Sequence, residues 1–151
     1  MRESTEVLLR LIEQNYLQMK QSEDQRATIS SVIVLIAAAI QGGLTQIGFN
    51  KNALTLTITL IIFGLFGTLA SEKLNERRSF YQYRIRNLFE RLEELVPEAD
   101  LPKIKKFTEE GHKLRYKKII FYRISRGHIW NALHLMITLT GILYTSIIIL
   151  K

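Results

Sequence analysis

Hydrophobic and polar positions alternate along this chain in long blocks, and the longest block that fits a single element covers residues 53–96. Its first part, ALTLTITLIIFGLFGTLA, carries no charge and passes without proline into the charged run SEKLNERRSFYQYRIRNLFERLEELV. Apolar residues in that run are spaced by 7, 4, 3, 4 and 3 positions, as on one face of a helix: Leu74, Tyr81, Ile85, Leu88, Leu92 and Leu95. At about 1.5 Å per residue, such a helix is roughly twice as long as the ~30 Å hydrocarbon core of a bilayer. We therefore predict one helix that crosses a membrane and continues into water as an arm.

Three windows of the chain contain no charged residue, namely residues 27–50, 52–71 and 127–150. Each window has about 20 residues or more, which is the length that a membrane-spanning helix needs. The first window is not typical of a cleaved signal peptide, because 26 polar and partly acidic residues precede it. The sequence therefore predicts an all-α membrane protein with three transmembrane helices.

The segments outside these windows have helical patterns of their own. Leu9, Ile12, Tyr16 and Met19 mark one face of an N-terminal amphipathic helix, with Ser4 as its N-cap. Pro97 and Pro102 end the arm, and a second helix over residues 101–126 returns toward the membrane, with Asp100 as its N-cap. The residues of this helix expected to face the arm are Ile104, Phe107, Leu114 and Phe121. The predicted division is a cytosolic N-terminal helix at 1–26, a transmembrane hairpin at 27–71, a cytosolic helical hairpin at 72–126 and a third span at 127–150. We expect the N-terminal helix and the cytosolic hairpin to form a small bundle.

Basic residues are concentrated in one segment. Of 21 lysines and arginines, 15 lie between residues 72 and 126, and single lysines stand at positions 51 and 151. The positive-inside rule then places the N-terminus and residues 72–126 in the cytoplasm and the C-terminus on the far side, in a bacterial inner membrane. Basic surface beside a membrane favours lipid headgroups over nucleic acid. The candidate contacts for lipid or another anionic ligand are Arg77, Arg78, Arg84, Lys117, Lys118, Arg123 and Arg126.

Two patterns inside the spans indicate helix packing. Small residues four or three positions apart, at Ala38 and Gly42 and at Gly64 and Gly67, allow helix backbones to approach closely in lipid, and they predict a homo-oligomer. The third span carries a polar face at spacings of 3, 4, 3 and 4, consisting of Asn131, His134, Thr138, Gly141 and Thr145. With Gln41 of the first span, this face is either an interhelical packing seam or the lining of a water-filled path.

Catalytic chemistry has little support in the sequence. The chain has no cysteine and three histidines, and it lacks a nucleotide-binding loop, a Ser–His–Asp order and an HExxH sequence. Glu109 and His112 match half of a carboxylate–histidine bundle motif, but a di-metal site needs two such motifs and two more glutamates. We expect no enzymatic activity, no cofactor and no metal.

The layout of an N-terminal helix (LLRLIEQNYLQMKQSEDQR), a tight pair of spans and a long arm (EKLNERRSFYQYRIRNLFERLEELVP) resembles the SLATT-type small bacterial membrane proteins. It is also similar to RipA-like oligomeric inner-membrane proteins. The likeness covers roughly residues 5–97, and the third span at 127–150 departs from it. The resemblance to the SLATT type implies an effector of anti-phage or conflict systems that forms a pore or perturbs the membrane, beside a cytosolic sensor or enzyme.

Two functions are therefore expected from the sequence. The first is an oligomeric inner-membrane effector, and the alternative is a membrane scaffold that docks a cytosolic partner on its helical arm.

Overall fold

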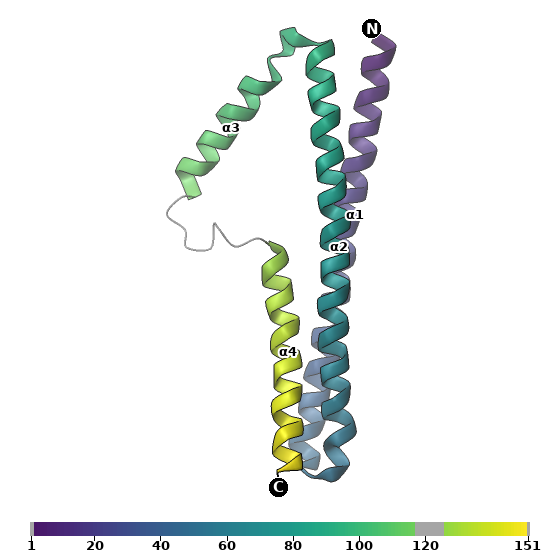
Figure 1. The fold of residues 1–151 in the computed structure, drawn as a ribbon, viewed down its shortest axis with the longest axis vertical. Coiled ribbons are helices and arrows are strands. Elements are labelled where there is room, and N and C mark those ends of the chain that lie inside the picture. Colours follow the sequence, from purple (N-terminus) through teal and green to yellow (C-terminus); the bar gives the residue numbers. More distant parts are fainter. Residues whose placement is uncertain (1, 117–125, 151) are drawn as a thin grey trace. The chain divides into compact units, whose positions relative to one another are not determined.

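The computed structural model describes residues 2–116 and 126–150. Within these residues every regular element is a helix: α1 (Arg2–Ile47), α2 (Leu54–Leu95), α3 (Leu101–Tyr116) and α4 (Arg126–Ile149), with the short 3-10 helices η1 (Lys51–Ala53) and η2 (Pro97–Ala99) (Figure 1). Helices α1, α2 and α4 are long and apolar enough to cross a membrane. The prediction of a helical membrane protein with three candidate spans is confirmed at this level.

Helix α2 follows the predicted bounds to within one residue at each end. Its predicted apolar face is also the shielded one, because Leu92 is buried and Leu74, Tyr81, Ile85, Leu88 and Leu95 are half-buried. The face predicted for the start of α1 is wrong in part: Ile12 and Met19 are half-buried, but Leu9 and Tyr16 are half exposed, and the buried positions are Asn15 and Ser22. Ser4 does not cap α1 either, because the helix already begins at Arg2.

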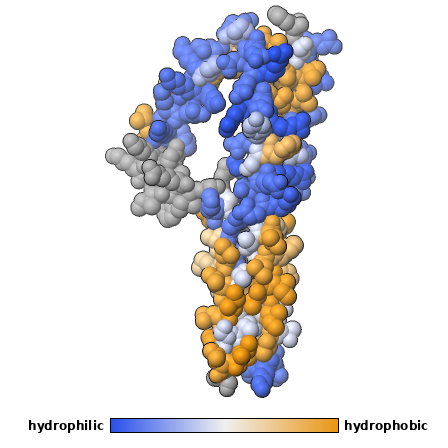
Figure 2. All heavy atoms as spheres, in the orientation of Figure 1, coloured by the Kyte–Doolittle hydropathy of each residue, from blue (hydrophilic) through white to orange (hydrophobic). Residues whose placement is uncertain are grey.

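The chain divides into two compact units, and α1 and α2 contribute to both. The charged unit consists of Met1–Ser22 and Glu76–Ser125, and the apolar unit consists of Glu23–Asn75 and Arg126–Lys151. Hydrophobic residues form a continuous band over the face of the apolar unit that Figure 2 shows, whereas hydrophilic residues dominate the charged unit. An outward-facing band of this kind is what a lipid environment requires of a membrane-spanning unit.

The interior of the apolar unit is built from one face of each long helix. Ile33, Ala37 and Leu44 of α1, Leu60 of α2 and Ile137 and Ile148 of α4 are buried together. The link from α1 to α2 is tight: Gly48 has φ +76° and Asn50 caps η1 by accepting a hydrogen bond from the Asn52 amide at 2.9 Å. A left-handed residue directly after a helix is the usual position for glycine.

Helices α2 and α4 pack in an antiparallel register that depends on glycine. A Cβ atom added at Gly64 would lie 2.7 Å from the Thr138 backbone nitrogen, and one added at Gly141 would lie 2.7 Å from Ile61 Cγ1. Real Cβ atoms do not come this close to other heavy atoms, so the two backbones approach each other only because side chains are absent there. Helix α4 itself runs within one residue of the predicted third span.

Helix α3 differs from the rest of the charged unit in its exposure. Ile104, Phe107 and Leu114 are 60%, 81% and 80% exposed, so the prediction that these side chains face the arm is wrong for the single chain. Phe121 lies outside the described residues. Asp100 directly precedes α3 as predicted, although with φ 46°, and its carboxylate pairs with Lys103 at 3.6 Å. The helix presents three large apolar side chains among five basic residues, and Gly111 leaves a gap between Phe107 and Leu114. Few apolar contacts are therefore offered to a neighbouring helix.

The glycine-dependent register gives a direct stability test. We expect Gly64→Ala to lower the thermal midpoint of the purified protein in detergent, because the new methyl group forces α2 and α4 apart at a cost of about 1–3 kcal/mol. Gly111→Ala in α3 is the control: no atom lies within 4 Å of its added Cβ, so alanine should be neutral or slightly stabilising. Equal midpoints for the two variants would contradict the register.

Candidate functional site

The polar face predicted on the third span lies inside the apolar unit. Its members on α4, namely Asn131, His134, Thr138, Gly141 and Thr145, are buried or half-buried against α1 and α2 of the same chain. We call these residues, together with the α1 and α2 residues that they contact, the polar seam. In the single chain the seam is interhelical, since its side chains meet protein on the neighbouring helices.

His134 lies at the centre of the polar seam, where its side chain is 0% exposed. Its Nε2 atom is 2.9 Å from the Ser30 hydroxyl oxygen of α1, in a hydrogen bond between two buried side chains. The other edge of the imidazole ring lies against Gly67 of α2, where an added Cβ would come within 2.7 Å of the ring carbon Cγ. His134 therefore joins α4 to both other helices, and glycine at position 67 makes room for the ring.

One end of the seam carries longer polar side chains. The Asn131 amide nitrogen donates a hydrogen bond to the Glu72 carboxylate, and Arg26 of α1 donates one to the Asn75 side-chain oxygen at 3.3 Å. Gly127 packs against the Asn75 amide, with 3.1 Å between an added Cβ and the amide atoms. Charged and amide groups thus meet at the end of the spans that continues into the charged unit.

The rest of the seam is made of hydroxyl groups and is interrupted. The Thr138 hydroxyl donates to the His134 carbonyl at 3.1 Å, and the Thr145 hydroxyl lies 2.9 Å from that of Thr57 on α2. Between these two threonines, Gly141 packs directly against the apolar side chain of Ile61. The polar groups therefore do not form a continuous row through the single chain.

The small residues of the spans fall into two groups. Gly64, Gly67 and Gly141 are buried between helices of one chain, whereas Ala38 and Gly42 of α1 are exposed. Gln41, which was predicted to join the polar face, is half-buried on α1. Only the first group packs against other helices of the chain, whereas Ala38 and Gly42 lie on its surface.

Several buried polar residues of the site escaped the sequence prediction. Ser30, Arg26, Thr57 and Ser71 have relative exposures of 3% or less. A signal was present in α1, since Ser22, Arg26 and Ser30 are spaced by four residues and lead into the buried positions Ile33 and Ala37. The residues of α2 carried no such signal, because threonines and serines in a span also occur where they bond only to their own helix, as Thr59 does.

The candidate anion contacts have varied surroundings. Arg77 is exposed, donates to the Gln18 side-chain oxygen at 3.2 Å and lies 5.9 Å from the Tyr81 ring centroid, while Arg84 lies 5.7 Å from that of Phe80. Arg78 is half-buried. Lys117, Lys118 and Arg123 lie outside the described residues, and of Arg126 only the backbone is described, as the first residue of α4. Arg77 and Arg84 thus lie against aromatic rings of their own unit, and Arg77 also contacts the Gln18 amide.

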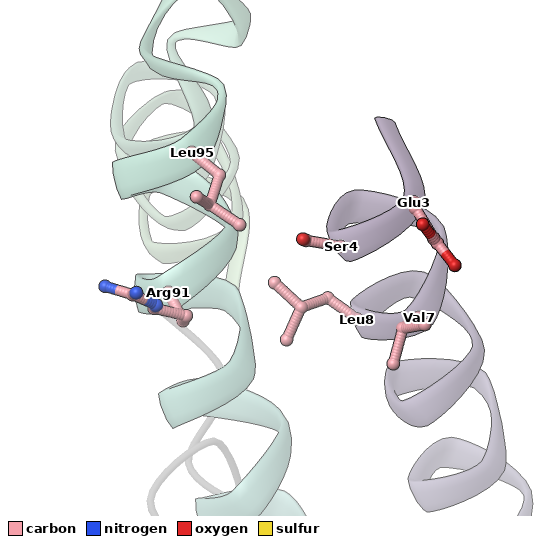
Figure 3. Close-up of a pocket in the computed structure, with 6 residues that line it drawn as sticks. All are labelled: Glu3, Ser4, Val7, Leu8, Arg91 and Leu95. Atoms are coloured by element: carbon pink, nitrogen blue, oxygen red, sulfur yellow. The ribbon is translucent and has the colours of Figure 1, made fainter. Parts of the chain in front are cut away.

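An open groove lies in the charged unit between the start of α1 and the end of α2 (Figure 3). It encloses about 490 Å³ and is lined by Glu3, Ser4, Val7, Leu8, Arg91 and Leu95. Arg91 forms an ion pair with Glu94. Glu109 and His112 are exposed on α3, and within residues 2–116 and 126–150 no group of three or more histidine, aspartate or glutamate side chains is placed to hold a metal ion.

Comparison of the chain with protein-family models, with curated proteins and with solved structures gave no match.

Proposed function

We propose that the protein is a self-associating effector of the bacterial inner membrane and has no enzymatic activity of its own. The observation that carries this proposal is the outward face of α1. Ser31, Leu35, Ala38, Gly42 and Thr45 follow one another at spacings of 4, 3, 4 and 3, and all five are exposed in the single chain. Small and hydroxyl side chains at this spacing are typical of helix contacts in lipid.

The outward face of α1 is favoured over the polar seam as the contact between copies. An added Cβ at Gly42 meets no atom within 4 Å, so a second helix has room to approach the backbone there. The seam offers no comparable surface, because His134 and Thr138 are already covered by their own chain. Membrane perturbation would then arise where several copies meet along α1, and any conducting path would lie between copies.

The proposed orientation of the protein in the membrane follows from the distribution of its basic residues. Fifteen of the 21 basic residues belong to residues 72–126, which favours the cytoplasmic side for the charged unit and the far side for the C-terminus. Exposed arginines such as Arg77 and Arg84 are then available to anionic lipid headgroups. Nucleic acid is a less suitable partner, since the basic residues stand beside the membrane and are mixed with nine acidic ones.

A scaffold function is the second candidate, and a separate observation favours it. Ile104, Phe107 and Leu114 place an uncovered apolar face on α3, within the unit proposed to be cytoplasmic. Amphipathic helices with such a face bind grooves of partner proteins, and a sensor or enzyme that acts with this protein is one such partner.

The topology is tested with single cysteines, since the chain has none of its own. Asn52→Cys should react with a membrane-impermeant thiol reagent added to intact cells, and Glu98→Cys should react only after lysis. Both positions are exposed in the structure, so accessibility of the side chain does not limit the reaction. The reverse labelling pattern would rule out the proposed orientation.

Self-association is tested by adding bulk to the outward face of α1. In nanodiscs, the double substitution Ala38→Leu with Gly42→Leu should shift the wild-type oligomer toward monomer, because leucine keeps the helix backbones apart. Ser146→Leu adds a similar side chain at an exposed position of α4 and should leave the oligomer intact. A monomeric wild-type protein would remove the basis of the proposal.

Effector and scaffold differ in their effect on cells. Overexpressed wild-type protein should depolarise the membrane, as read with a voltage-sensitive dye, and the Ala38→Leu/Gly42→Leu variant should abolish the signal together with the oligomer. His134→Leu with Thr138→Leu should instead reduce the amount of folded protein, because it breaks buried hydrogen bonds. An unchanged dye signal from membrane-inserted wild type, with loss of a bound cytosolic protein in Phe107→Asp, would favour the scaffold.

A further inference from the structure

His134 is surrounded by all three helices of the apolar unit. Its ring is fully buried, with Ser30 of α1 bonded to Nε2 at 2.9 Å and with Gly67 of α2 against the opposite edge. Nδ1 is buried and has no hydrogen-bond partner in the part of the chain that the structure describes. The site thus offers one polar partner to a side chain that has two ring nitrogens.

This geometry selects one form of the imidazole. In a neutral ring one nitrogen carries a hydrogen and the other accepts. A hydrogen on Nδ1 would point at the Gly67 backbone, where no acceptor is present among the described residues. Buried N–H groups without an acceptor are rarer than buried acceptors without a donor. The neutral ring with its hydrogen on Nε2, donated to the Ser30 oxygen, therefore fits the site.

The protonated ring does not fit. An imidazolium has two N–H donors and a positive charge, and Ser30 satisfies only one donor. The charged groups nearest along each helix lie at one end of the seam: Arg26 of α1, one turn from Ser30, repels the cation, and Glu72 of α2 is already bonded to Asn131. On α4 the nearest titratable side chain is His128, which is exposed. A buried charge without a partner is strongly unfavourable in a protein interior.

We propose that His134 is a proton-operated clasp, which holds α4 against α1 and α2 in its neutral form and releases α4 from the seam when it takes up a proton. The released form binds the extra proton, so acid favours release and the docked state is the stable one at neutral and higher pH. A free histidine side chain titrates near pH 6.5, so the docked state should lose stability as the pH falls through this range. The clasp goes beyond the proposed function and does not depend on it.

The experiment uses the full chain in nanodiscs, with His112→Gln and His128→Gln so that His134 is the sole imidazole. Nitrogen-15 NMR at pH 7.5 should show a neutral ring with its hydrogen on Nε2. Trp130, the only tryptophan, lies on α4, and its fluorescence follows the thermal release of that helix. We expect the thermal midpoint of this release to be lower at pH 5.5 than at pH 7.5, by about 3 °C or more.

Two variants separate the clasp from a general acid effect. His134→Asn should lose at least half of the pH-dependent shift. Ser30→Ala keeps the histidine but removes its partner, so it should lower the midpoint at pH 7.5 and leave the ring hydrogen distributed over both nitrogens. The proposal is overturned by a charged ring or an Nδ1-protonated ring at pH 7.5, or by an equal pH shift with and without His134. The NMR result does not require either variant to fold.

Discussion

A bilayer contains no water to satisfy polar groups, and the arrangement of the apolar unit follows from this constraint. The three candidate spans contain serine, threonine, asparagine and histidine side chains, and in lipid each of them would need a partner supplied by protein. The structure turns some of these groups inward, where Ser30 meets His134 and Thr57 meets Thr145. Glycines at 64, 67 and 141 bring the backbones close enough for such short side chains to meet. Other leucine, isoleucine and methionine side chains, such as Leu35, Ile62 and Met136, form the exposed surface of the apolar unit.

The residues that α1 and α2 bury differ between the two units. In the apolar unit the buried positions of α1 and α2 combine apolar residues such as Ile33 and Leu60 with polar ones such as Ser30, whereas in the charged unit the shielded face of α2 is apolar, with Leu92 buried. The kind of residue that α2 buries therefore changes between Asn75 and Glu76, where the two units divide. The inward face of α1 retains polar residues on both sides of its division, with Asn15 and Ser22 in one unit and Arg26 and Ser30 in the other.

Much of the fold followed from the sequence, because long uncharged windows and an uninterrupted apolar periodicity determine where helices run. The bounds of α2 and α4 were predicted to within one residue for this reason. Which face of a helix is buried was harder to predict than where the helix runs. Leu9 and Tyr16 have the same helical spacing as buried residues, and only the neighbouring helix decides which face is covered. Periodicity within one helix does not contain the register between two spans. The sequence therefore could not predict that Ser30 and Gly67 lie opposite the polar face.

The distribution of small residues connects this packing to function. A span needs small residues wherever another helix approaches closely, so a small residue without a neighbour in its own chain indicates a contact that the single chain does not make. Gly64, Gly67 and Gly141 are accounted for by α2 and α4, and this leaves Ala38 and Gly42 on α1. The same reasoning separates the two polar sets of the spans: seam residues such as His134 and Thr145 bond to other helices of the same chain, whereas Ser31 and Thr45 bond only to carbonyls of their own helix. The surface proposed for contact between copies is therefore on α1, whereas the polar seam joins the helices within one chain.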